Sequence, residues 1–168
     1  MKYLIVVDMQ NDFTTGSLGS AHAAAIIPAV ERLVTSFDGK IIFTRDTHGV
    51  DYLTTQEGRN LPVVHCVKDT HGWEICDALK PYVSCVVDKA TFGSMELPGI
   101  LAAYGEEIEE ITLCGLCTDI CVISNAMILK AAFPEVSISV EASCCAGVTM
   151  ESHRTALDAM GAVQIAVR

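Results

Sequence analysis

The chain has 168 residues, the size of one domain, so we expect a single domain spanning residues 1–168 with a core that needs no disulfide or metal staples. Its formal net charge of −10 argues against a nucleic-acid partner, because proteins that bind phosphate backbones carry basic surfaces. Although 51% of the residues are hydrophobic, no apolar run reaches the length of about 18 residues that crosses a membrane. The first apolar run is too short for a secretory signal and ends at Asp8, so we expect a cytoplasmic protein.

Six short apolar runs predict strands, at residues 2–7, 40–44, 82–87, 111–114, 136–140 and 163–166. Segments with helical spacing or length lie between them, at residues 26–37, 73–79, 94–104, 121–133 and 149–160. The last of these helices opens with a Thr-x-x-Ser cap. Strands that alternate with helices predict βαβ units, and therefore an α/β fold with a mostly parallel sheet covered by helices on both faces.

Reactive side chains follow four of the predicted strands. They are Asp8, the pair Asp46 and His48, Lys89, and Cys121 after a turn at Gly115. Parallel sheets bind ligands beyond the carboxyl ends of their strands, where the strand order reverses. The sequence therefore predicts a functional site at this edge of the sheet.

Cys121 is the candidate nucleophile of this site. Thr118 and Asp119 can cap the helix that follows, so the thiol lies near a helix N-terminus, where the dipole favours a thiolate. A nearby ammonium of Lys89 would stabilise that thiolate, and Asp8 could accept the thiol proton and return it to a leaving group. The alternative is a buried structural cysteine, a solvated carboxylate at a strand end and a surface lysine.

A metal site is predicted beside this trio. Asp46 and His48 stand two residues apart, and His65 follows in the long irregular segment 49–70. One carboxylate and two imidazoles suit a divalent metal, with zinc as the first expectation and iron or manganese as alternatives. Glu57, in the same segment, is either a fourth ligand or a solvated carboxylate. The competing interpretation gives all of these residues capping or surface roles.

Three aromatic residues flank the predicted site and could stack on a planar ligand: Phe13, Tyr52 and Trp73. They could equally be ordinary core or rim residues.

The chain also contains eight cysteines, inside apolar runs and without a secretory signal, so a disulfide framework is not expected. Cys114-x-x-Cys117 could be a redox or zinc pair, but no second such pair occurs and Cys114 lies within a strand. A non-catalytic, redox-sensing protein that uses Cys114, Cys117 and Cys121 is the alternative from a different functional class. A sensor would not need both Asp8 and Lys89.

Five segments resemble the isochorismatase-like cysteine hydrolases, and within them the nicotinamidases. They are Asp8-Met-Gln-Asn-Asp-Phe, Asp46-Thr-His, Pro62-Val-Val-His-Cys, Lys89-Ala-Thr-Phe and Gly115-Leu-Cys-Thr-Asp-Ile-Cys-Val. The likeness covers essentially the whole chain in the family's order. It implies a three-layer α/β/α fold with a six-stranded sheet and a triad of Asp8, Lys89 and Cys121. It also implies a cis peptide between Leu116 and Cys117, which helps to turn the backbone N–H groups of Cys117 and Cys121 toward an oxyanion.

The resemblance further implies a metal held by Asp46, His48 and His65, a site that isochorismatases proper lack. It therefore favours hydrolysis of a carbon–nitrogen bond in a small carboxamide, with nicotinamide as the first expectation. The resemblance also implies a homo-oligomer, either a dimer or a tetramer. Another small amide or a ureido compound is the alternative substrate. The chain departs from the family in segment 52–58, in segment 68–72 and at Cys117, where alanine is common. These departures leave the triad intact and the substrate open.

Overall fold

The computed structural model describes residues 1–168 and is built on one sheet with the strand order β3-β2-β1-β4-β5-β6. The strands are β1 (Lys2–Val7), β2 (Lys40–Asp46), β3 (Val86–Lys89), β4 (Glu110–Leu116), β5 (Ser137–Ala146) and β6 (Ala166–Val167). Every neighbouring pair is parallel. The predicted six-stranded α/β fold is therefore confirmed.

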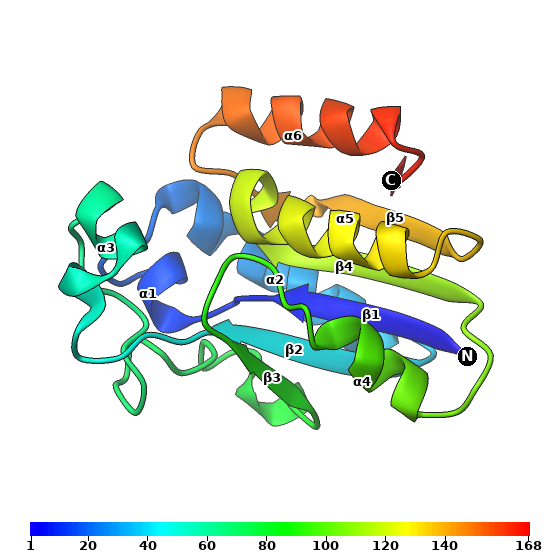
Figure 1. The fold of residues 1–168 in the computed structure, drawn as a ribbon, viewed down its shortest axis with the longest axis horizontal. Coiled ribbons are helices and arrows are strands. Elements are labelled where there is room, and N and C mark those ends of the chain that lie inside the picture. The colour runs from blue at the N-terminus through cyan, green and yellow to red at the C-terminus, as the bar shows by residue number, and fades with distance from the viewer.

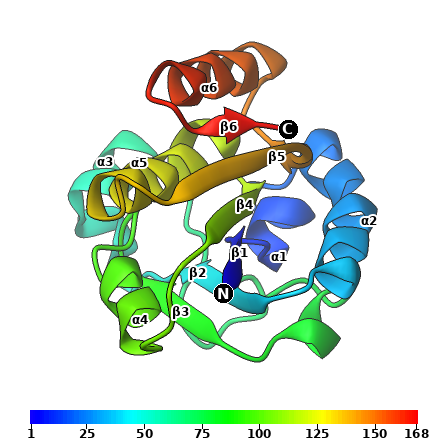
Figure 2. The ribbon, with the colours of Figure 1, turned by 90° about the vertical axis from the view of Figure 1, so that its right-hand side faces the viewer.

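Helices cover both faces of this sheet (Figures 1 and 2). They are α1 (Asn11–Thr14), α2 (Ala21–Ser36), α3 (Gln56–Asn60), α4 (Leu97–Ala103), α5 (Ile123–Ala132) and α6 (Met150–Ala162). Figure 2 shows α2 on one side of the sheet and α4 and α5 on the other, with α6 lying over β6 at the sheet's end. Two 3₁₀ turns, η1 (Tyr52–Thr54) and η2 (Lys80–Tyr82), and a π-helical turn, η3 (Thr118–Val122), complete the elements. No helix combines the length and the apolar character that a membrane span requires.

The hydrophobic core is centred on β1, in the middle of the sheet. In β1 the five residues from Tyr3 to Val7 are completely buried, as expected for a strand with helices over both faces. They belong to one hydrophobic cluster of 33 buried residues. The strand that carries Asp8 at its end is therefore held on both faces and along both edges.

The strand order reverses between β1 and β4, because β1 pairs with β2 on one side and with β4 on the other. Gly115 allows β4 to approach β1 closely at this point. It has a φ of +113°, and a Cβ there would lie 2.1 Å from the carbonyl oxygen of Val7. A larger residue would clash with β1 and be strained in that conformation. The carboxyl ends of β1 and β4 thus meet at the point where a parallel sheet binds its ligand.

Several predicted boundaries differ from the structure. The helix predicted at residues 73–79 is wrong, because this segment instead bonds to the chain after β1: the N–H of Asn11 donates to the Glu74 carbonyl and that of Cys76 to the Met9 carbonyl. The strand predicted at 82–87 begins only at Val86, after the turn η2. Helix α2 starts earlier than predicted, capped by the Ser20 hydroxyl, so its Pro28 lies in the second turn rather than the first. The Thr149–Ser152 cap of α6 is confirmed.

Candidate active site

The structure gathers the predicted trio at the carboxyl ends of β1, β3 and β4. The Nζ atom of Lys89 lies 2.6 Å from Asp8 Oδ2 and 3.6 Å from Cys121 Sγ. All three residues are buried. A single ammonium thus touches both the candidate base and the candidate nucleophile.

Asp8 is fixed in place by the neighbouring strand. Its Oδ1 accepts a 2.6 Å hydrogen bond from the Thr44 hydroxyl, and its backbone N–H donates to the Thr44 carbonyl. Its φ of +47° is uncommon for a residue other than glycine, and such strain is concentrated at functional sites. Burial raises the pKa of Asp8, while the ammonium of Lys89 opposes that rise. Oδ2, the carboxylate oxygen that Thr44 does not contact, faces the Lys89 ammonium.

The acidity predicted for Cys121 requires a correction. Burial raises the pKa of this thiol, and the charge of Asp8 adds to the rise while Lys89 opposes it. The thiol lies within the π-helical turn η3 rather than in the first turn of a regular α-helix. The expectation of a readily ionised cysteine neglected complete burial and a nearby carboxylate. The surroundings of Cys121 thus favour its neutral form over the thiolate, contrary to the expectation from the helix dipole.

A second cluster adjoins the trio and contains the predicted metal ligands. Ligand atoms of Asp46, His48, Glu57 and His65 all lie within 4.8 Å of one another. The Nε2 of His48 is 2.9 Å from Asp46 Oδ2, and the Nε2 of His65 is 3.6 Å from the same oxygen. Glu57 Oε1 is 3.7 Å from both imidazoles. Glu57, left open by the sequence, thus belongs with the other three.

These four side chains fit a divalent metal on chemical grounds. Asp46 Oδ1 is buried and accepts no hydrogen bond, although the Lys89 ammonium lies 3.6 Å away, and such an oxygen is costly to bury unless another ligand satisfies it. Burial opposes the ionisation of Asp46, but hydrogen bonds with His48 and His65 outweigh it and hold the pKa of this carboxyl below its usual value. The Nδ1 of His65 lies 2.7 Å from the carbonyl of Val63, which turns Nε2 into the cluster as in many metal sites.

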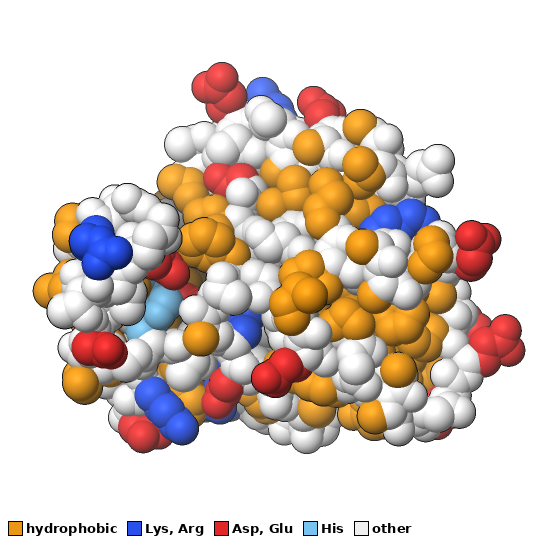
Figure 3. Space-filling model, viewed as in Figure 1, with side chains coloured by type: hydrophobic (Ala, Val, Ile, Leu, Met, Phe, Trp, Pro, Cys, Tyr) orange, Lys and Arg blue, Asp and Glu red, His pale blue; other side chains and the backbone are white.

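A cavity of about 520 Å³ opens beside both clusters, at the end of the molecule where Figure 3 shows histidine within a hollow. Seventeen residues line it: Phe13, Ser17, Leu18, Gly19, Ser20, Ala23, Asp46, Glu57, Leu61, His65, Phe92, Leu116, Cys117, Ile120, Cys121, Gly147 and Val148. Its volume falls within the range of about 300–1,000 Å³ that is usual for small-molecule sites. Cys121 and the candidate metal ligands Asp46, Glu57 and His65 therefore face one ligand space.

Of the three predicted aromatic contacts, only Phe13 lines this cavity. Tyr52 is buried against the rings of His48 and His65, with its hydroxyl donating to the Leu61 carbonyl. The indole of Trp73 lies under the Arg45 guanidinium, 3.6 Å away. The interpretation of Tyr52 and Trp73 as substrate contacts is therefore corrected.

Sequence reasoning missed Phe92, which also lines the cavity, although it ends the Lys89-Ala-Thr-Phe segment and is 42% exposed.

The remaining cysteines form no alternative centre. All eight are free, and Cys114 is completely buried in β4. The only group of potential metal ligands is the quartet around Asp46, which contains no cysteine. The Leu116–Cys117 peptide is cis, as the resemblance implied, and Cys117 faces the same cavity as Cys121.

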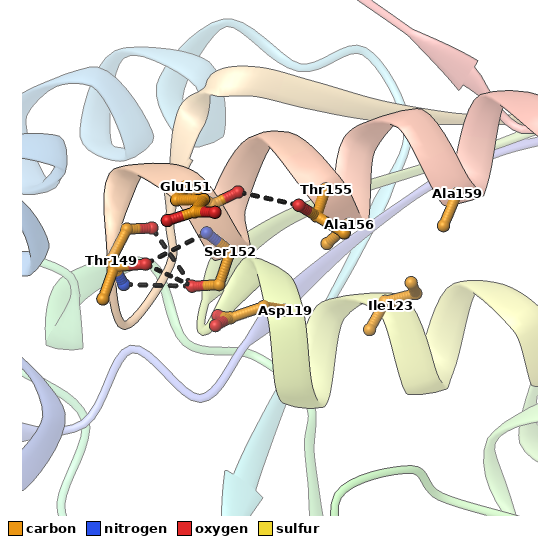
Figure 4. A pocket seen from close by; sticks show the side chains of 8 residues that line it. All are labelled: Asp119, Ile123, Thr149, Glu151, Ser152, Thr155, Ala156 and Ala159. Carbon is orange, nitrogen blue, oxygen red and sulfur yellow. Dashed lines mark hydrogen bonds between the residues drawn. The ribbon is translucent and has the colours of Figure 1, made fainter.

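A second hollow lies between α5 and α6 and is shown in Figure 4. Its polar side chains serve the fold: Thr149 and Ser152 form the capping box of α6, and Asp119 accepts the N–H of Val148. None of its eight lining residues belongs to the trio or to the metal quartet. It therefore offers no chemistry that competes with the site at the sheet edge.

The fold is a six-stranded parallel α/β sheet with Asp8, Lys89 and Cys121 gathered at one edge, and comparisons with known proteins assign its family. Residues 2–167 match the isochorismatase domain model. The nicotinamidase of Acinetobacter baylyi is 30% identical over 155 residues, which cover 74% of this chain and 72% of that protein. The chain therefore belongs to the isochorismatase family, as its sequence segments predicted.

Solved structures agree with this assignment. The pyrazinamidase of Pyrococcus horikoshii, solved in complex with zinc, is 26% identical and has a TM-score of 0.84, covering 99% of this chain and 98% of its own. The PnC1 protein of L. infantum, solved with nicotinate, is 20% identical with a TM-score of 0.87, covering 99% and 91%, and shows the shared fold. The chain is a hydrolase of the nicotinamidase type.

Proposed function

We propose that the protein is a metal-containing amidohydrolase that converts nicotinamide to nicotinate and ammonia. One observation carries the proposal: the ammonium of Lys89 joins Asp8 and Cys121 beside a cavity whose wall also contains Asp46 and His65. This combination supplies a nucleophile, a base and a metal cluster to the same small ligand. The relatives named for nicotinamide and pyrazinamide hydrolysis support the choice of substrate.

The proposed reaction has two halves. Asp8 takes the proton of Cys121 as the sulfur attacks the amide carbon, and the backbone N–H groups of Cys117 and Cys121 bind the oxyanion. As the carbon–nitrogen bond breaks, Asp8 gives that proton to the departing ammonia, and a thioester remains. Asp8 then deprotonates a water that cleaves the thioester, which returns the thiol and releases the carboxylic acid. The Lys89 ammonium stabilises the charged forms of both partners throughout.

Asp46, His48 and His65, with Glu57 as a fourth ligand, would hold the metal, with zinc as our first choice. A metal there would supply a Lewis-acidic point to bind a pyridine nitrogen and water. Phe13 would pack on the ring of the substrate. No lysine or arginine side chain lines the cavity, which disfavours a substrate that carries carboxylates and favours an uncharged amide.

The test is ammonia release from nicotinamide by purified protein, with metal content determined on the same sample. Turnover should disappear in Cys121→Ala with the fold intact. Cys144→Ala is the matched control, because it removes a buried thiol from β5, away from the cavity. Full activity in Cys121→Ala would refute the mechanism. Bound metal without turnover of nicotinamide would direct the search to other amides and ureido compounds. Reversible disulfide formation without any amidase activity would favour the redox-sensing alternative.

A further inference from the structure

Asn125, one helical turn after Cys121, connects two parts of the candidate site. It is completely buried, and its Oδ1 accepts a 2.9 Å hydrogen bond from the backbone N–H of Ser94. Its Nδ2 donates to the carbonyl of Cys121 at 2.8 Å and to that of Phe92 at 3.2 Å. One amide thus joins the turn that carries the thiol to the segment that follows Lys89.

The orientation of this amide is determined by its partners. The N–H of Ser94 can only donate, and the two carbonyl oxygens can only accept, so Oδ1 must face the first and Nδ2 the others. Asparagine meets both demands at once. Aspartate could still accept from Ser94 but would have no N–H for either carbonyl.

The segment held in this way contributes directly to the site. The carbonyl of Thr91 accepts a 3.1 Å hydrogen bond from Lys89 Nζ, the same ammonium that contacts Asp8 and Cys121. Phe92 forms part of the cavity wall although it is 42% exposed. The segment therefore fixes a catalytic ammonium and one side of the ligand space.

The segment also packs closely on α5 at Gly93. A Cβ on Gly93 would lie 2.5 Å from Ile128 Cδ1 and 3.3 Å from the Cβ of Ser124, so the backbone lies directly on α5. Without Asn125, the only side-chain hydrogen bond to residues 91–94 would be that from Lys89 itself. The amide is thus the main polar attachment between the segment and α5.

We infer that Asn125 is a positioning residue: it holds the segment 91–94 on the nucleophile's turn, so that Thr91 orients Lys89 and Phe92 closes the cavity. This inference rests on the proposed amidase function for its kinetic consequences. Loss of the tether should raise KM through Phe92 and lower kcat through Lys89. Small displacements of catalytic groups have large kinetic effects, so we expect a loss of about 10- to 100-fold in kcat/KM.

The experiment compares Asn125→Ala, Asn125→Asp and the control Ser124→Ala. The Ser124 hydroxyl donates to the Ile120 carbonyl within the same helical turn and makes no bond to residues 91–94, so the control loses a comparable hydrogen bond without loosening the segment. Hydrogen–deuterium exchange of a peptide covering residues 90–95 reports the tether without requiring turnover. Melting temperature, kcat and KM for the hydrolysed amide complete the set.

We expect faster exchange of residues 90–95 and a higher KM in Asn125→Ala, with a smaller increase in exchange in Asn125→Asp, because it keeps the bond from Ser94. Ser124→Ala should match the wild-type protein in both. The inference is overturned if exchange in this peptide does not change, or if KM and kcat stay at their wild-type values while only the melting temperature falls. If the wild-type protein hydrolyses no amide, the proposed function fails, and the exchange result still decides whether Asn125 holds the segment.

Discussion

The two polar clusters of the site are built in different ways. Asp8 and Lys89 stand at the ends of strands, and the pairing of β1, β2 and β3 in the sheet fixes where these ends lie. In the metal cluster, only Asp46 lies in a strand, at the end of β2. The other three members, His48, Glu57 and His65, come from the segment between β2 and β3. Sheet register thus sets the geometry of the ion pair, whereas the cap of α3 holds Glu57 and a contact with the Val63 carbonyl orients His65.

This difference predicts where each cluster is vulnerable. The ion pair is buried and integral to the sheet, so a change there should affect folding and chemistry together. The ligands on segment 49–70 depend on local hydrogen bonds, so changes there should alter metal affinity more than stability. The clusters are also linked, because Lys89 Nζ lies 3.6 Å from Asp46 Oδ1.

The largest effect should come from Lys89→Met. This change leaves the carboxylate of Asp8 buried without its ammonium, so we expect a loss of about 3–5 kcal/mol in the free energy of unfolding. We also expect kcat/KM to fall roughly 10³-fold or more, as for other members of catalytic triads. Denaturant unfolding and ammonia release measure the two losses.

Lys80→Met is the control for this prediction, because Lys80 also contacts two carboxylates but at the exposed surface. It should change neither quantity appreciably. The double variant Asp8→Asn with Lys89→Met should recover stability without recovering activity. Substantial turnover in Lys89→Met alone would remove Lys89 from the mechanism.

Metal removal should have the next largest effect. Dialysis against a chelator should abolish amide hydrolysis, and added zinc should restore it, while circular dichroism shows that the sheet persists. His65→Ala should lose bound metal, whereas His71→Ala, an exposed histidine of the same part of the chain, should retain it. Activity that survives chelation with no metal detectable would show that the quartet is structural.

The smallest effect is expected from removing a single helix cap, and it tests whether the cap of α3 controls metal binding in addition to stability. The Thr55 hydroxyl accepts the N–H of Gly58 and caps α3, the short helix that carries Glu57. Thr55→Ala should lower stability by about 1 kcal/mol and weaken metal binding by about tenfold. Thr149→Ala removes the equivalent cap from α6, and it should reduce stability by a similar amount without altering metal affinity. Equal metal affinity in the two variants would contradict the proposed role of α3.

Features that depend on order along the chain were predictable from the sequence. Asp8 directly follows a predicted strand and Asp46 and Lys89 each lie two residues beyond one, and a parallel sheet necessarily brings such ends to one edge. The strand β1 was predicted with its observed limits because its apolar run is continuous and stops at a charged residue. The gathering of the trio was predictable because its members follow apolar runs and because a parallel sheet brings the ends of such runs together.

Features that depend on long-range contacts were not predictable. The segment after Gly72 has helical spacing, but its backbone bonds to the chain after β1 and forms turns instead. The raised pKa of Cys121 reflects burial and the approach of Asp8, which spacing along the chain does not reveal. Asn125 looks like any polar residue within a helix until the segment after Lys89 is placed against it.

The position of β1 between β2 and β4 also has a consequence for synthesis of the protein. When ribosomes add roughly 5–20 residues per second, β4 emerges on the order of ten seconds after β1. During that interval the edge of β1 that pairs with β4 leaves its backbone N–H and C=O groups without partners, and such edges template aggregation. Yield during expression should therefore depend on temperature and on chaperones that cover this edge until β4 arrives.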